Sequence, residues 1–190
     1  MKIRNLKINN FDMKKYHDFK ENGKTAIKDI KDFMNKLLLK TDFDMFAVSE
    51  VTIMTYNSFV IDGHLQKGYY SEEEWQNLDG ERFSLWEAIR PFCLQVIKGK
   101  KTPESFKIVL LLSEKDKRNL INGYEELPAA GYRNDNVHGL YLNLKYENSE
   151  LYITTGTSVA FFTVDKSLEN IWTKYVKDFL IERSIDFEEM

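Results

Sequence analysis

The order of helical and extended segments constrains the fold of this chain more than any single motif does. Apolar residues recur every three or four positions over about 26–40 and again over 168–183, which predicts two amphipathic helices. Runs rich in β-branched and aromatic residues, such as 46–56 and 105–112, predict strands. Long helices combined with separate runs of strands are typical of an α+β protein, in which helices pack on an antiparallel sheet.

The two halves of the chain repeat this order of elements. The first half reads as a helix (26–40), three strands (46–56, 58–65 and 66–70) and a helix (85–97), with a leading strand near 3–8 or 25–27. The second half reads as a strand (106–112), a helix (114–122), three strands (139–146, 151–155 and 159–164) and a helix (168–183). The strings TYNSFVIDG and KYENSELYITTG fall at matching places. The sequence therefore predicts an antiparallel sheet with helices on one face and an internal duplication of a β-α-βββ-α unit.

These elements predict a single α+β domain over 24–184, with pseudo-repeat halves 24–99 and 104–184. Residues 1–23 are expected to form an N-terminal arm, and residues 185–190 an acidic tail. Pro91 should kink or divide the helix that contains it, and the loop 127–137 should be mobile because it is rich in breaking and polar residues. Gly156 is expected at positive φ in a turn between threonine-rich strands.

Composition excludes several classes of protein. The chain has 190 residues, of which 43% are hydrophobic, so it is long and apolar enough to bury a core. It has no apolar run near the ~20 residues of a membrane helix and no apolar signal segment, so we expect a cytoplasmic protein without membrane partners. One cysteine, Cys93, and three dispersed histidines predict neither a disulfide nor a metal site, and no cofactor motif is present.

The string FVIDGHL contains the best candidates for chemistry. Asp62 and His64 alternate along a predicted strand, so they share one face and could act as an acid–base pair. Trp86 and Arg90 lie four residues apart on a predicted helix, where a guanidinium over an indole could bind a carboxylate or phosphate. One hypothesis is therefore a ligand site or enzyme with these four residues in one cleft. The alternatives are an ordinary turn at 62–64 and a packed Trp–Arg pair, with Cys93 as an inert buried thiol.

Basic residues gather on two predicted helices although the net charge is −3. These residues are Lys28, Lys31, Lys36 and Lys40 on one helix, and Lys115, Lys117 and Arg118 on the other. If the two helices lay side by side on an open surface, their charges could follow a nucleic-acid backbone. Acidic residues interrupt both groups, which favours ordinary ion pairs on exposed helices instead.

Several separated strings together resemble a known family. They are KDFMNKLLL, FVIDGHL, SLWEAIRPFCLQVIKGKKTPESFKIVLLLS, VHGLYLNLKY, and TTGTS followed by FTVDKSLENIW. In this order they resemble an uncharacterised family of small Gram-positive bacterial proteins that carries only a domain-of-unknown-function label. The resemblance covers about 25–181, and the residues before Lys24 depart from it, since the family usually starts near the first helix. It implies a bacterial, cytoplasmic setting and brings no activity, ligand or catalytic residue.

The sequence favours a non-catalytic binding or interaction protein, because strong patterning of a folded domain coexists with no coherent nucleophile, metal or cofactor motif. Its partner is unidentified, and a protein partner or a second copy of the chain is the first expectation. The alternatives are nucleic-acid binding through the basic helices and a small-ligand protein or enzyme that uses Asp62, His64 and Arg90.

Overall fold

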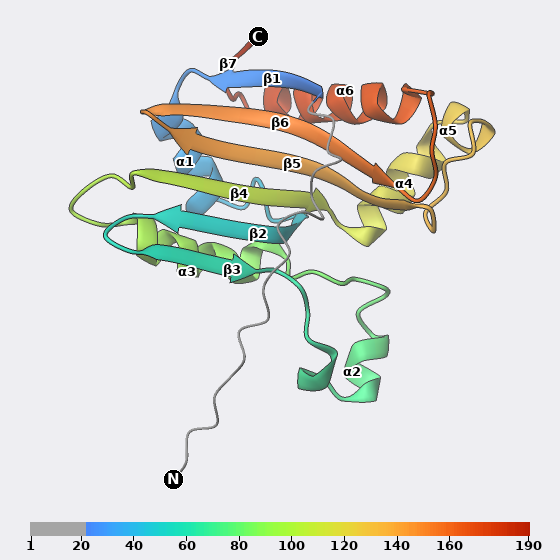
Figure 1. Cartoon of the computed structure of the whole chain (residues 1–190), viewed down its shortest axis with the longest axis horizontal. Helices are drawn as coiled ribbons and strands as arrows, with labels where there is room; N and C mark the ends of the chain where they lie inside the picture. Colours follow the sequence, from blue (N-terminus) through green and yellow to red (C-terminus); the bar gives the residue numbers. More distant parts are fainter. Residues whose placement is uncertain (1–21) are drawn as a thin grey trace.

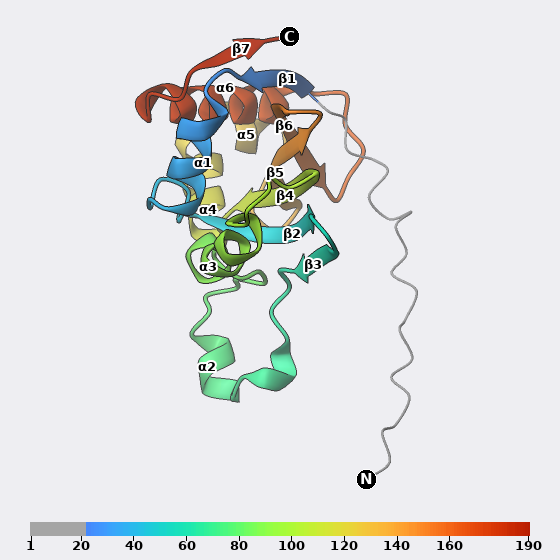
Figure 2. The ribbon, with the colours of Figure 1, turned by 90° about the vertical axis from the view of Figure 1, so that its left-hand side faces the viewer.

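A computed structural model describes residues 22–190, which form one seven-stranded antiparallel sheet with helices packed on one face (Figure 1, Figure 2). The strands are β1 (Asn22–Ile27), β2 (Phe46–Met54), β3 (Ser58–Asp62), β4 (Ser105–Leu112), β5 (Val137–Glu147), β6 (Glu150–Val159) and β7 (Phe187–Glu189). The helices are α1 (Ile30–Leu38), α2 (Glu72–Gln76), α3 (Trp86–Ile97), α4 (Glu114–Gly123), α5 (Glu126–Ala129) and α6 (Ser167–Glu182). The predicted α+β class is confirmed. Residues 1–21, with most of the predicted arm and the expected strand near 3–8, lie outside the described residues.

Alternation along the strands separates the helix-covered face of the sheet from the open face. On β4, Phe106, Ile108 and Leu110 belong to the main core beneath the helices, whereas Lys107 is exposed. A smaller apolar cluster lies apart from the main core and includes Val109 and Leu111 of the same strand. This two-sided pattern is typical of an antiparallel sheet with helices on one face.

Both halves of the chain contribute to the same sheet, but they do so in different strand orders. The full order is β3-β2-β4-β5-β6-β1-β7. In the second half the leading strand β4 pairs with β5, whereas in the first half β1 lies between β6 and β7 and does not pair with β2. The predicted internal duplication is therefore not shown by the strand arrangement.

Three of the predicted strand features are wrong. Residues 66–70 do not form a strand, because Lys67–Tyr69 make a turn of 3-10 helix in a segment that projects from the sheet (Figure 2). β6 ends at Val159, so the strand expected over 159–164 is absent from the described chain. Gly156 lies inside β6 and pairs with Tyr141 rather than forming a turn, since the flanking β-branched threonines favour a continuous strand.

Three further expectations concern a helix, a loop and the C-terminal residues. Pro91 lies within α3 and does not divide it into two helices, while a kink there stays a prediction. The residue four positions earlier, whose carbonyl loses its amide partner, is the exposed Glu87. The loop 127–137 overlaps α5, and the buried Tyr132 donates its hydroxyl to the Asp165 carbonyl at 3.0 Å, whereas the expected mobility of this loop stays a prediction. The predicted tail at 185–190 contains β7, which pairs with β1.

No helix within residues 22–190 has the length and apolar character needed to cross a membrane.

Candidate functional site

Asp62 and His64 form a pair at the end of β3, where the chain leaves the sheet. Asp62 Oδ1 accepts a hydrogen bond from the His64 backbone N–H at 3.0 Å and lies 2.5 Å from His64 Nδ1. The imidazole packs on the Phe83 ring, with the ring centroids 4.4 Å apart. Both side chains of the pair are exposed. The expectation that Asp62 and His64 share one face therefore agrees with the geometry, and ligand binding by them stays a prediction.

Trp86 and Arg90 are placed elsewhere, where they attach α3 to the end of α1. Trp86 is fully buried, and its Nε1–H donates to the Leu37 carbonyl at 2.8 Å. Arg90 Nη2 lies 2.9 Å from Asp44 Oδ2, and both side chains are largely buried. The structure therefore does not bring the four predicted ligand-binding residues into one cleft, because Trp86 and Arg90 hold elements of the core together.

Two of the basic residues considered for nucleic-acid binding are buried and paired inside the protein. Lys36 contacts the Asp32 carboxylate and donates to the Ser184 carbonyl at 3.0 Å. Lys117 donates to Glu114 Oε1 and to the Val137 carbonyl, each at 2.8 Å. Buried ammonium groups are retained where such partners replace the lost water. Neither residue is available to a phosphate group.

Of the other five basic residues of that hypothesis, Lys28, Lys31 and Lys40 lie on or beside α1, and Lys115 and Arg118 lie on α4. Lys31 on α1 and Lys115 on α4 are exposed, and Arg118 contacts the Asp79 carboxylate. α1 packs against α3, whereas α4 packs against α5. Nucleic-acid binding stays a prediction, but it lacks the paired basic helices on which it depended.

An open groove of about 530 Å³ lies between α1 and α3. Its apolar lining comes from both helices and consists of Met34, Leu38, Leu39, Leu94 and Ile97. Leu39, at the end of α1, is 60% exposed. The sequence predicted both helices but no groove between them. The run Leu37-Leu38-Leu39 is the signal that was missed, because three consecutive leucines extend beyond a single helix face.

Charged side chains line the rim of this groove, and they differ in how fully they are paired. Asp29 caps α1 by accepting a hydrogen bond from the Asp32 N–H at 2.9 Å, and Asp32 contacts Lys36. Lys31 and Lys98 are both exposed, and neither makes an ion pair with a residue in the described part of the chain. Asp29 also makes no ion pair among the described residues, so two unpaired lysines stand against one unpaired carboxylate and the net charge beside the apolar lining is positive.

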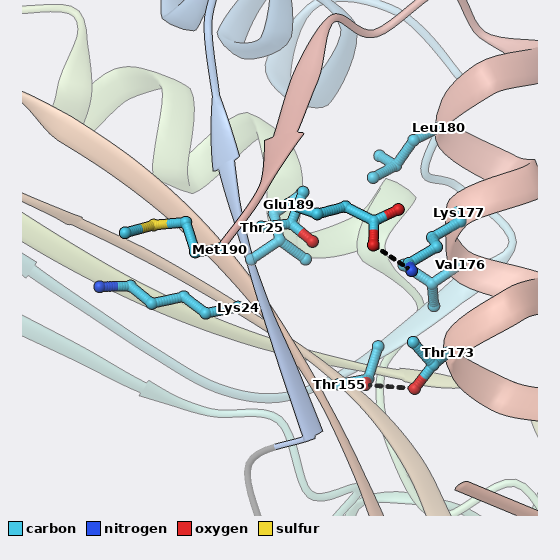
Figure 3. A pocket seen from close by; sticks show the side chains of 10 residues that line it. Lys24, Thr25, Thr155, Thr173, Val176, Lys177, Leu180, Glu189 and Met190 are labelled. Atoms are coloured by element: carbon cyan, nitrogen blue, oxygen red, sulfur yellow. Dashed lines mark hydrogen bonds and ion pairs between the residues drawn. The ribbon is translucent and has the colours of Figure 1, made fainter. Parts of the chain in front are cut away.

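A second cavity, of only about 40 Å³, lies between α6 and the strands β1, β6 and β7 (Figure 3). The hydroxyls of Thr155 and Thr173 lie 3.0 Å apart at its wall, and Lys177 pairs with Glu189 at 2.7 Å. A space of this size suits about one buried water molecule. We therefore assign this cavity a structural role.

Potential metal ligands and the Cys93 thiol were two further candidates for chemistry over residues 22–190. No group of three or more His, Cys, Asp or Glu side chains in that range could hold a metal ion. Burial raises the pKa of the Cys93 thiol from 9.0 to about 12, so the thiol stays protonated at neutral pH. Thiolate, rather than thiol, is the nucleophilic form, and the geometry therefore fits an inert core residue.

The raised pKa of Cys93 gives a testable pH dependence. The unfolded thiol ionises near pH 9 and the folded thiol near pH 12, so the unfolded state binds fewer protons between these values. Cys93 should therefore add nothing to the pH dependence of unfolding below pH 9 and lower the free energy of unfolding as pH rises from 9 to 12. Urea titrations of the wild type and Cys93→Ala at several pH values isolate this contribution. Parallel pH profiles for the two proteins would contradict it.

The model of a family of unknown function (DUF5721) matches residues 36–188. Neither a curated protein nor a solved structure matches the chain.

Proposed function

The chain belongs to this family of unknown function, and we propose that it is a non-catalytic binding protein. Its binding site is the groove between α1 and α3, and its partner is an amphipathic helix of another protein with acidic residues beside an apolar stripe. The observation that carries this proposal is the apolar groove whose rim presents Lys31 and Lys98 without ion pairs among the described residues.

The shape of the groove supports a helical partner. Two helices form its walls, and it is open to solvent along one side, so a third helix can insert a ridge of side chains between them. Helices that bind in this way place apolar anchors at positions i, i+3, i+4 and i+7. Met34, Leu38, Leu94 and Ile97 supply the apolar surface that such anchors would cover, and burial of that surface would drive the association.

The charges at the rim support the acidic character of the partner. Lys31 stands on α1 and Lys98 follows the last residue of α3, so each wall of the groove carries one cation. Lys36 neutralises Asp32, and the remaining carboxylate of the lining, Asp29, caps α1, so the two lysines leave the rim with a net positive charge. Carboxylates that flank an apolar stripe would meet the two lysines and set the orientation of the bound helix.

The test uses a labelled helical peptide with leucines at i, i+3, i+4 and i+7 and glutamates on both sides of that stripe. We expect it to bind the full-length protein, and Leu39→Glu to weaken its affinity by at least about tenfold. Reversing the rim charges with Lys31→Glu and Lys98→Glu should lower the affinity for the glutamate-flanked peptide. The same changes should raise the affinity for a version of the peptide that has lysines in place of the glutamates. Fluorescence anisotropy gives the affinities, and amide chemical shifts locate the bound peptide.

The chain offers a matched control for each variant. Phe92 on α3 is 65% exposed and does not line the groove, so Phe92→Glu should leave peptide affinity unchanged. Lys115→Glu serves the same purpose for the charge reversals, because Lys115 lies on α4. Failure of the peptide to bind, equal binding of a scrambled peptide, or equal loss in Leu39→Glu and Phe92→Glu would overturn the proposal. Competition by single-stranded DNA that weakens steeply with salt would favour the nucleic-acid alternative instead.

A further inference from the structure

The two edges of the sheet are protected to very different degrees. At one edge β7 has only three residues, Phe187–Glu189, and two of them are glutamates. At the other edge β3 has five residues, Ser58–Asp62, with no lysine or proline. Short, charged edge strands resist pairing with other chains, whereas longer apolar ones promote it. β3 is therefore the edge that is open to another strand.

The surroundings of β3 add apolar surface and no charge. Residues 51–61, which make up most of the β2–β3 hairpin, contain no Asp, Glu, Lys, Arg or His. Val60 is 68% exposed and Tyr56 at the hairpin turn is 86% exposed. The charge on this edge is confined to Asp62 at its end, so a second copy meets no like charge as long as the two Asp62 side chains stay apart.

Hydrogen bonding within the hairpin fixes which backbone groups of β3 point outward. The Thr55 N–H donates to the Asn57 carbonyl at 2.9 Å, and the Gly63 N–H donates to the Ser49 carbonyl at 3.0 Å. Along an antiparallel strand, the backbone N–H and C=O groups of alternate residues point toward the same neighbouring strand. The backbone groups of residues 57, 59, 61 and 63 therefore point toward β2. The N–H and C=O groups of Ser58, Val60 and Asp62 therefore point away from the sheet.

We infer that two copies of this chain associate by antiparallel pairing of β3 with β3, centred on Val60. This register places Val60 opposite Val60 and Ser58 opposite Asp62, so that all the outward-facing groups of both strands find partners. It also keeps the two Asp62 carboxylates apart, whereas a register centred on Asp62 would place them opposite each other. On the helix side of the sheet, Phe59 of each copy meets Ile61 of the other. Such a contact is isologous and joins both sheets into one.

Because the contact is symmetric, it can be tested by mixing two variants that carry opposite charges at residue 60. Wild-type protein is expected to show a mass of about twice the 22.5 kDa chain in light scattering at high concentration. Val60→Lys places two ammonium groups opposite each other, and Val60→Glu two carboxylates, so each variant alone should be monomeric. An equimolar mixture of the two variants should restore the dimer, since each pair then joins opposite charges. Restoration by mixing separates this contact from general damage to the fold.

Val164→Lys is the matched control, because Val164 is 85% exposed and lies outside the sheet. It should remain dimeric, and circular dichroism should show that all three variants are folded. A monomeric wild type at every concentration, or Val60→Lys and Val60→Glu variants that remain dimeric, would overturn the inference, as would a mixture that fails to reassociate. None of these measurements depends on the α1–α3 groove, so the peptide proposal stands or falls separately.

Discussion

Replacing Trp86 with alanine should lower the free energy of unfolding by about 3–5 kcal/mol, the usual cost of removing a large aromatic side chain from a core. Trp86 has no solvent exposure, and its indole contributes to the main apolar cluster beneath the sheet. Its Nε1–H also donates to the Leu37 carbonyl at 2.8 Å, which ties α3 to α1. The alanine variant loses apolar burial and leaves that carbonyl without its partner.

The test of this prediction has two further variants. Trp86→Phe keeps most of the apolar burial but removes the donor, so it should destabilise the protein less than Trp86→Ala does. The loss that remains reflects the unpaired Leu37 carbonyl and the smaller ring. Trp75→Ala is the control, because Trp75 lies on the projecting helix α2 and is only partly buried. Urea unfolding followed by circular dichroism measures all three. Equal losses for Trp86→Ala and Trp75→Ala would contradict a core role for Trp86.

Trp86 also shows where reasoning from the sequence reaches its limit. The prediction that Trp86 and Arg90 lie on one helix is confirmed. Spacing along a helix places two side chains on one flank, but it does not reveal what packs against that flank. Here the end of α1 and Asp44 occupy it, and both come from a distant part of the sequence. The same limit hid the burial of Lys36 and Lys117, whose carbonyl partners Ser184 and Val137 are remote in sequence.

The predictions that succeeded depend on local periodicity. The cores of α1, α3 and α6 and the strands β2, β3, β4 and β5 follow from helical or alternating patterns within each segment. The predictions that failed depend on pairing over long distances. Strand pairing is decided by which strand edges remain free after the rest of the sheet has assembled. This applies to residues 66–70, which do not extend the sheet, and to β1, which lies beside β6 rather than β2. The groove between α1 and α3 belongs to the same class, because it exists only once the two helices are packed.

Gly63→Ala is expected to lower the free energy of unfolding by about 3 kcal/mol, because no space exists for the added methyl group. An ideal Cβ at this position would lie 1.7 Å from the backbone oxygen of Val48, and a backbone atom cannot move aside as a flexible side chain can. Gly63 also donates its N–H to the Ser49 carbonyl at 3.0 Å and accepts from the Ser84 N–H at 2.8 Å. Accommodating the methyl group requires the chain to separate from β2 and to lose these bonds.

This prediction distinguishes a close approach of two backbones from an ordinary turn, which is the role that the Asp-Gly dipeptide suggested from sequence. Gly68→Ala is the control, since a Cβ at Gly68 would meet nothing within 4 Å. There the reduced freedom of the unfolded chain should leave stability unchanged or slightly increased.

Urea unfolding compares the two variants, and hydrogen exchange at Ser84 reports the lost pairing directly. If Gly63→Ala were as stable as Gly68→Ala, with Ser84 still protected, the tight contact with Val48 would have no energetic role. A large loss confined to Gly63→Ala would show that this glycine fixes the junction between β3, β2 and the returning segment, and with it the position of Asp62 and His64.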